Sequence, residues 1–324
     1  MKTIEELQVL IDEEIHAQYR ILEPRELYEP MWYTLSNGGK RLRPVFVLMG
    51  CQLFKDDVRK AALPALGIEM FHNFTLLHDD IMDKAFMRRN LPTVHVKWDV
   101  NRAILSGDAL AIQSNIFIAS CDKEILPDVL RVFNSTALQV CEGQQYDLNF
   151  ERIPEVSVAD YLNMIRLKTA VLIAGSLQIG ALIGGADAEW AKKVYEMGDM
   201  IGMAFQLQDD FLDTFGNPVT FGKNIGGDIL ANKKTFLLIK AREMANPEQR
   251  SLLDHYYSSE DFNADIKIES VKKVFHDLEI DKITIDKVHF YSQKALEILE
   301  EIPVEPARKK ELEKFTRNLM DRIR

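Results

Sequence analysis

Two acidic clusters in this sequence have the residue type and the spacing of metal ligands. Asp79 and Asp83 are four residues apart, and Asp209 and Asp213 repeat this spacing later in the chain, with Gln206 one turn earlier. Residues at positions i and i+4 share one face of a helix, so each pair can converge on a single ion. Magnesium takes one or two carboxylates per ion and leaves its other positions to water and phosphate oxygens. The spacing therefore predicts magnesium sites.

A solvated acidic helix surface is the alternative interpretation of each cluster. Both clusters are nevertheless embedded in apolar helical sequence, FHNFTLLHDDIMD in the first case and FQLQDDFLD in the second. Like charges four apart destabilise an isolated helix by roughly 0.2–0.5 kcal/mol per pair, and burial raises that cost when no cation is present. We therefore expect cations beside both acidic helices.

Three short irregular stretches, residues 36–43, 84–92 and 215–233, supply positive charge. In the first of them, Lys40 and Arg43 stand three residues apart at the opening of a helix, behind a pair of glycines. Helix N-termini and glycine backbone favour anions, and arginine can bind two phosphate oxygens at once.

Each acidic cluster is followed by a basic stretch. Arg88 and Arg89 follow the first cluster, and Lys223 and Lys233 follow the second. A basic pair at a helix C-terminus can simply complement the helix dipole. The repeated acidic-then-basic order nevertheless indicates a diphosphate site, in which carboxylates hold magnesium, magnesium holds diphosphate and cationic side chains neutralise the outer oxygens.

The elements that position these clusters are expected to be helices. Gly 16 and Pro 11 are low counts for 324 residues, and helical periodicity extends along the chain. Thr3 with Glu6 forms a capping-box pattern ahead of the first helix, which Pro24 is expected to end. Ser157 is expected to cap another helix, and Pro247 to open a later one. No composition break divides the chain, so we expect one all-α domain over residues 1–324.

The composition also restricts the function and the location. A net charge of −10 disfavours nucleic-acid binding as the main activity. The three cysteines have no CxxC spacing and are expected to be buried thiols in a reducing compartment. The N-terminal sequence has no apolar signal region. The apolar segment 170–186 contains four glycines and is expected to be a buried central helix, so we expect a cytoplasmic protein without stable membrane insertion.

Taken in order, the motifs resemble those of the trans-isoprenyl diphosphate synthases, the family of farnesyl and geranylgeranyl diphosphate synthases. The similarity extends over residues 38–235 and comprises GGKRLRP, a histidine seven residues before DDIMD, RR, KT, FQLQDD and GK…GGDI…KKT. It implies an all-α isoprenoid synthase fold with helices around a central cavity, and a homodimer. It also implies the 1′-4 condensation of isopentenyl diphosphate with an allylic diphosphate, with three magnesium ions per site.

The resemblance assigns a role to each matching residue. The implied magnesium ligands are Asp79, Asp83 and Asp209, supported by Asp80, Asp210 and Asp213. The implied residues for isopentenyl diphosphate are Lys40, Arg43, His72 and Arg89. The allylic diphosphate would be held by Arg88, Lys168, Lys223 and Lys233, and Thr169 and Gln206 would lie beside the reacting carbon. Asp147 resembles a family position near the metal site.

The residues upstream of Asp79 are expected to set the length of the product. Phe74 lies five residues earlier, roughly 7.5 Å deeper along the helix at about 1.5 Å per residue. Thr75 is small, and Phe71 can act as a second stop one turn further down. In the family, one aromatic residue at the fifth position resembles enzymes that make the C20 product geranylgeranyl diphosphate. Farnesyl diphosphate (C15) is the next expectation, and a longer polyprenyl product is an alternative.

Two further alternatives belong to other functional classes. A terpene cyclase of the same helical superfamily would not need a second diphosphate pocket, so Lys40, Arg43 and Arg89 argue against it. A non-catalytic subunit of a heteromeric synthase would have eroded motifs, whereas both aspartate motifs are intact here.

Overall fold

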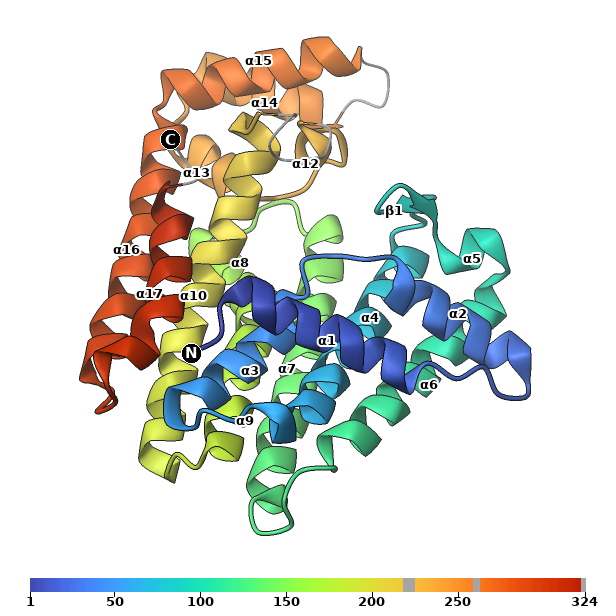
Figure 1. Cartoon of the computed structure of the whole chain (residues 1–324). Helices are drawn as coiled ribbons and strands as arrows, with labels where there is room; N and C mark the ends of the chain where they lie inside the picture. The colour runs from blue at the N-terminus through green and yellow to red at the C-terminus, as the bar shows by residue number, and fades with distance from the viewer. Residues whose placement is uncertain (218–224, 259–262, 322–324) are drawn as a thin grey trace. The chain divides into compact units, whose positions relative to one another are not determined.

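A computed structural model describes residues 1–217, 225–258 and 263–321, and these residues are almost entirely helical, as the sequence predicts (Figure 1). The only strands among them are β1 and β2, which pair antiparallel. The elements are α1 (Ile4–Gln18), α2 (Arg25–Ser36), α3 (Leu42–Phe54), η1 (Arg59–Ala61), α4 (Ala62–Met82), β1 (Met87–Arg88), β2 (Leu91–Pro92), α5 (Val94–Lys97), α6 (Val100–Ile118), α7 (Leu126–Arg152), α8 (Val158–Ile165), η2 (Arg166–Ala170), α9 (Val171–Gly184), α10 (Ala188–Phe215), α12 (Gly227–Leu230), α13 (Phe236–Met244), α14 (Pro247–Ser258), α15 (Ala264–Asp277), α16 (Ile280–Glu301) and α17 (Pro306–Asp321).

The expected helix starts are confirmed. The Thr3 hydroxyl accepts from the Glu6 amide, and the Glu6 carboxylate accepts from the Thr3 amide, which completes the capping box of α1. Ser157 caps α8, and α14 begins at Pro247. The expected stop at Pro24 is wrong in detail, because α1 already ends at Gln18. Pro24 instead precedes α2 as its N-cap, a position where its missing N–H costs no hydrogen bond.

The chain divides into two compact units. The first contains residues 1–137, 175–195 and 302–311, and the second contains residues 138–174, 196–301 and 312–324. Helices α7, α9, α10 and α17 therefore contribute residues to both units. The single domain expected from the sequence stays a prediction.

The core of the first unit is built around α4, which packs on α6 and α3. Glycines set how closely the helices of this unit approach. A Cβ atom at Gly180 of α9 would lie 1.9 Å from the Val47 carbonyl oxygen of α3, and one at Gly50 would lie 2.2 Å from the Leu177 carbonyl oxygen. Neither position accepts a side chain, so Gly180 of the apolar segment and Gly50 of α3 allow these two helices to pack closely.

Helices α8, η2 and α9 form one continuous helix, Val158–Gly184, which is long and apolar enough to cross a membrane by length and composition alone. In its most apolar window, 83% of the residues are buried within the protein. Such burial is typical of a core helix, in agreement with the expectation for residues 170–186.

The second unit has its own apolar core, in which α13, α14, α15 and α16 pack against one another (Figure 1). Its buried residues are Ile229, Leu237, Leu238, Ala241, Leu253, Val271, Val274, Phe275 and Ile280.

The three cysteines are free, but they are not all buried as expected. Cys51 is buried, Cys121 is half-buried and Cys141 is exposed. Cys141 lies on the outer side of α7 near Leu138, whose side chain is also exposed. The apolar sequence around Cys141 therefore marks an exposed face of this helix, so the expectation of burial was wrong there.

Candidate active site

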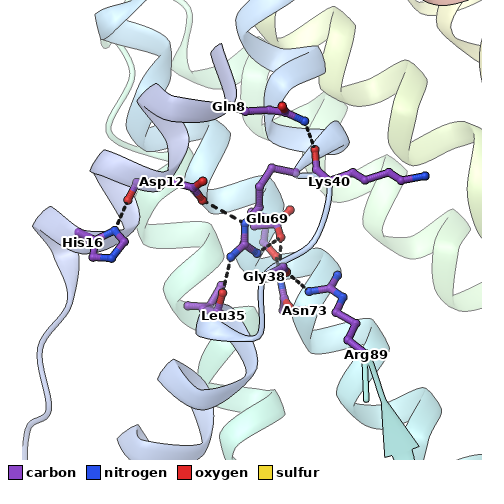
Figure 2. Close-up of polar contacts among 10 residues, drawn as sticks. Gln8, Asp12, His16, Leu35, Gly38, Lys40, Glu69, Asn73 and Arg89 are labelled. Atoms are coloured by element: carbon purple, nitrogen blue, oxygen red, sulfur yellow. Dashed lines mark hydrogen bonds and ion pairs between the residues drawn. The ribbon is translucent and has the colours of Figure 1, made fainter. Parts of the chain in front are cut away.

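The four residues implied for isopentenyl diphosphate lie around one loop of the first unit. This loop, residues 37–41, joins α2 to α3 and carries Lys40, whereas Arg43 lies in the first turn of α3. The Arg43 guanidinium donates to His72 Nε2 at 3.1 Å. Arg89 donates to the Gly38 carbonyl oxygen of the loop, a contact drawn in Figure 2. Two segments distant in sequence thus bring their cations to the same place.

The glycine pair ahead of Lys40 has a specific steric role. Both glycines have positive φ, 71° at Gly38 and 122° at Gly39. A Cβ atom at Gly39 would lie 2.7 Å from Arg89 Cζ, so any larger residue would displace the guanidinium. The loop therefore needs glycine for its backbone conformation and for the close approach of Arg89.

His72 is held in its neutral form. Burial lowers the pKa of its imidazole well below the ordinary value of 6.5, and the charge of Arg43 lowers it further. A neutral imidazole has one unprotonated nitrogen, which is what the Arg43 N–H group requires as an acceptor.

Arg89 is presented by a hairpin that the sequence analysis did not predict. Strands β1 and β2 pair Arg88 with Leu91, which leaves Arg89 and Asn90 as a two-residue turn. Both turn residues have positive φ, 51° and 62°, as a type I′ turn requires. The usual Asn-Gly signal is absent, and the strands are only two residues long, so sequence pattern alone gave no indication of this hairpin.

The first aspartate motif lies at the C-terminal end of α4. Asp79 and Asp80 are helical, and Asp83 is the C-cap residue. Asp80 is 5% exposed, and its carboxylate accepts from Arg88 Nε at 2.8 Å. This pairing orients Arg88, and the supporting role of Asp80 at a metal site stays a prediction.

In the second unit, Lys168 and Thr169 lie in η2, which is a π-helical turn. Such turns are frequent at functional sites. Lys168 Nζ pairs with the Asp147 carboxylate at 2.5 Å. A Cβ atom at Gly143 of α7 would lie 2.2 Å from the Lys168 backbone nitrogen, so α7 packs directly on this turn.

Thr169 and Gln206, implied to lie beside the reacting carbon, contact each other. The Thr169 hydroxyl donates to Gln206 Oε1 at 2.9 Å, and Gln206 Nε2 donates to Asp210 Oδ1 at 3.0 Å. Tyr161 donates to the other oxygen of Asp210. Burial raises the pKa of Asp210 to about 8, although both hydrogen bonds act to lower it. Asp210 thus orients the Gln206 amide. No sequence signal points to Tyr161, because no motif contains it.

The remaining residues of the second motif and its basic loop connect to α12. Asp213 accepts from the Asp228 amide at 2.9 Å, and Lys233 Nζ lies 3.6 Å from Asp228 Oδ1. Lys234 instead donates to the Phe150 and Ile153 carbonyl oxygens at the end of α7, which fixes the loop that carries Lys233. Lys223 lies outside the described residues.

The implied chain-length residues Phe71 and Phe74 belong to a cluster of tilted and edge-to-face aromatic rings in the first unit. The Phe71 and Phe74 rings are 5.6 Å apart between centroids, and the Phe74 ring lies 4.8 Å from the His78 ring. Phe133 of α7 packs edge-on against Phe71 at 5.5 Å. The Thr75 hydroxyl donates to the His72 carbonyl oxygen of its own helix. Phe133 could not be found from sequence, because only the packing of α7 places it here.

The donor chemistry of the aspartate motifs fits magnesium. Within the described ranges, no three His, Cys, Asp or Glu side chains are grouped as a preformed metal cage. Magnesium does not require such a cage, because water and substrate phosphates complete its octahedron around one or two carboxylates. Asp79 and Asp83 at the end of α4 belong to the first unit, and Asp209 of α10 belongs to the second.

The sequence was also compared with known proteins. It matches the family described as Polyprenyl synthetase over residues 24–278. It is 38% identical over 235 residues to the geranylgeranyl diphosphate synthase of Methanosarcina mazei, with 72% of each chain covered. It is 36% identical over 311 residues to the geranylfarnesyl diphosphate synthase of Aeropyrum pernix, covering 94% of this chain and 96% of that protein. A crystal structure of a geranylgeranyl pyrophosphate synthase matches with a TM-score of 0.94 and 44% identity, over 99% of both chains.

Proposed function

Because this chain belongs to the polyprenyl synthetase family, we propose that it is a trans-prenyltransferase that joins isopentenyl diphosphate to an allylic diphosphate and releases diphosphate. The observation that carries this proposal is the grouping of Lys40, Arg43, His72 and Arg89 around one loop. A condensation needs a pocket for a second diphosphate, and these residues have the charge and hydrogen-bonding capacity for it. A terpene cyclase would have no use for them.

The other diphosphate is assigned to residues near the aspartate motifs. Asp79, Asp83 and Asp209 are the proposed magnesium ligands for three ions, with Asp80, Asp210 and Asp213 as supporting residues. The proposed ligands of the allylic diphosphate are Arg88, Lys168, Lys223 and Lys233. The pairing of Arg88 with Asp80 and of Lys168 with Asp147 supports this assignment, because both cations are already oriented by carboxylates.

The role of each residue follows from the charges that develop on the leaving diphosphate and on the allylic carbon. Magnesium, when bound, stabilises the departing diphosphate as a Lewis acid. Lys168 and Arg88 neutralise its outer oxygens while the allylic C–O bond ionises. The carbocation then lies beside the oxygens of Thr169 and Gln206. Because Thr169 donates its only hydroxyl proton to Gln206, the lone pairs of its oxygen remain available to a positive charge. The isopentenyl double bond attacks, and the proton lost afterwards goes to the released diphosphate.

The proposed product is geranylgeranyl diphosphate, with farnesyl diphosphate next. Phe74 and Phe71, backed by Phe133, form the proposed floor that stops the growing chain. The relatives include both a geranylgeranyl and a geranylfarnesyl diphosphate synthase. A C25 or longer product is therefore the alternative that product sizing must decide.

We also propose a single functional domain over residues 1–324, a cytoplasmic location and a homodimer. The outer face of α6 supports the homodimer, because it exposes apolar side chains that water solvates poorly. These residues are Val100, Ile104, Leu105, Ile112 and Ile116. Analytical ultracentrifugation tests the dimer, and charged substitutions at Ile112 and Ile116 should yield monomers.

The test of the reaction is incubation of the purified protein with magnesium, labelled isopentenyl diphosphate and each allylic primer from C5 to C15. A dominant C20 product sized by chromatography is the expected result. Chelation with EDTA should abolish product formation, and added magnesium should restore it. Asp209→Asn should lower kcat by about 100-fold or more, as expected when a metal ligand of the transition state is lost.

A matched control is Asp286→Asn, which neutralises an exposed aspartate of α16 and should leave the rate unchanged. If folded wild-type protein forms no product with any primer, the enzyme proposal is wrong. A non-catalytic subunit then becomes the better explanation.

A further inference from the structure

Arg41 stands between Lys40 and Arg43 of the proposed isopentenyl diphosphate pocket, yet its side chain is only 5% exposed. We infer that Arg41 and its buried partner Glu69 are positioning residues that hold Lys40, Arg43 and His72 in place for isopentenyl diphosphate. This inference rests on the proposed function. It concerns residues that touch no substrate in that proposal and act through their neighbours.

The Arg41 guanidinium connects three helices of the first unit. Nη1 donates to Glu69 Oε1 of α4 at 2.7 Å, and Nη2 donates to the Leu35 carbonyl oxygen in the last turn of α2. Nε donates to Asp12 Oδ1 of α1 at 3.4 Å. Figure 2 shows its partners Asp12, Leu35 and Glu69 with these contacts as dashed lines. Because each of the three guanidinium nitrogens donates a hydrogen bond, the orientation of the group and of the adjacent loop is fixed.

Glu69 connects the same ion pair to the helix that carries His72. Its side chain is 2% exposed, and Oε1 also accepts from Asn73 Nδ2 at 3.0 Å. Glu69 precedes His72 by three residues on α4, which places both on neighbouring parts of one helix surface. One buried carboxylate thereby fixes the spacing between the Lys40 loop and the imidazole that contacts Arg43.

The backbone at Arg41 requires such an anchor. Arg41 has φ 47° and ψ 32°, in the left-handed region that disfavours residues with a Cβ atom. Strained residues of this kind persist only when surrounding contacts determine them, and they concentrate at functional sites. This conformation directs Arg41 into the core, whereas Lys40 on one side is exposed and Arg43 on the other is half-buried.

Helix α1 also contacts the loop at residues 37–41. We call the contacts that hold this loop the frame. Gln8 Nε2 donates to the Lys40 carbonyl oxygen at 2.6 Å, one turn of α1 before Asp12. Residues 4–18 precede the segment that matches the family, which begins at residue 24. The frame therefore includes a helix to which the motifs assign no role.

The loop is thus held from three sides before any substrate binds. Arg89 contacts Gly38 from the hairpin, Gln8 contacts Lys40 from α1, and Glu69 contacts Arg41 from α4. Because the loop is already ordered, binding of a diphosphate costs little conformational entropy, and this favours affinity. Loosening the frame should weaken isopentenyl diphosphate binding and leave the allylic diphosphate unaffected.

Steady-state kinetics of Glu69→Gln test this inference, because the substitution keeps the shape of the side chain and removes its charge. We expect the KM for isopentenyl diphosphate to rise about tenfold, with kcat and the KM for the allylic diphosphate within twofold of wild type. Asp12→Asn and Gln8→Ala, which should fold normally, should raise the same KM about twofold to threefold. The matched control is Asp57→Asn, which removes an exposed 2.8 Å ion pair with Arg59 in the same unit.

A double variant separates positioning from stability. Arg41→Gln leaves the buried Glu69 charge uncompensated, and Arg41→Gln with Glu69→Gln removes both charges. We expect the double variant to regain thermal stability relative to Arg41→Gln while its KM for isopentenyl diphosphate stays high. If the KM returns to the wild-type value together with stability, or if Glu69→Gln raises both KM values equally, the pair has only a structural role and the inference is wrong.

Failure of the proposed function would be recognised separately. If wild-type protein makes no prenyl product, calorimetric titration with isopentenyl diphosphate itself replaces the kinetics. Weaker binding to Glu69→Gln than to wild type would then still support the frame. Absence of binding to wild-type protein would overturn it together with the function.

Discussion

Thr169 lies in a π-helical turn and donates its hydroxyl proton to Gln206 of α10 at 2.9 Å. The two residues come from the KT and FQLQDD motifs and are 37 positions apart in sequence. Gln206 in turn donates to Asp210, and Tyr161 donates to the other oxygen of Asp210. This chain of hydrogen bonds fixes the Gln206 amide. The carbonyl dipole proposed to stabilise the carbocation is thereby oriented in advance.

Thr169→Val should lower kcat by about 10- to 100-fold, because it removes one oriented oxygen and releases the Gln206 carbonyl. The substitution keeps the shape of the side chain, so thermal stability should change little. The measurement is kcat at saturating substrates. A matched control is Thr316→Val in α17, whose hydroxyl donates to the Leu312 carbonyl oxygen of its own helix. Equal loss of kcat in both variants would contradict the assignment.

Gly202→Ala should disturb the same turn from the α10 side. The added Cβ atom would lie 2.4 Å from Ala170 Cα, a distance that backbone atoms cannot tolerate. Overpacking of this kind costs about 1–3 kcal/mol, so the melting temperature should fall. Because Ala170 follows Thr169 directly, kcat should fall as well. Thermal unfolding and single-turnover kinetics measure the two effects, and a variant with wild-type kinetics would show that the turn tolerates displacement.

The sequence was sufficient to predict the all-helical fold and several helix starts, whereas the roles of the candidate site residues stay predictions. Periodicity and caps such as Thr3 and Ser157 are local signals, and the aspartate pairs depend only on helical spacing. The hairpin at Arg89 was missed because its strands are too short to show alternation. Pro24 was taken as the end of α1 because a proline gives the same signal before a helix as after one.

The supporting residues could not be predicted, because they act through contacts between distant segments. Glu69 and Tyr161 belong to no motif. Each is identified only by its buried contact, Glu69 with Arg41 and Tyr161 with Asp210. The sequence also gives no sign of a role for Phe133, since a phenylalanine on an amphipathic helix is usually a core residue.

Phe74→Ala should lengthen the product from C20 to C25 or beyond, because it removes the first ring of the proposed floor. Phe133→Ala should have a smaller effect, since Phe133 supports Phe71 from behind at 5.5 Å. Chromatographic sizing of products measures both changes. Phe290 of α16, in the second unit, is 50% exposed and serves as the control, and Phe290→Ala should leave the product unchanged. Unaltered C20 product from Phe74→Ala would place the stop elsewhere.

The stability of the protein should decrease as the pH falls below about 6.5, in part because of His72. Burial and Arg43 keep the pKa of the folded imidazole well below its ordinary value of 6.5. Below pH 6.5 the unfolded chain therefore binds a proton that folded His72 does not, and the unfolding free energy falls by at most about 1.4 kcal/mol per pH unit from this residue.

Urea unfolding between pH 5 and 8 measures this slope for wild type and for His72→Gln. Glutamine keeps an acceptor for the Arg43 N–H group but cannot titrate, so the variant should lose this share of the pH dependence and keep the rest. Equal slopes in the two proteins would mean that folded His72 takes up the proton after all. In that event imidazolium would face the Arg43 guanidinium, and the hydrogen bond between them at 3.1 Å could not persist, since both groups would be donors.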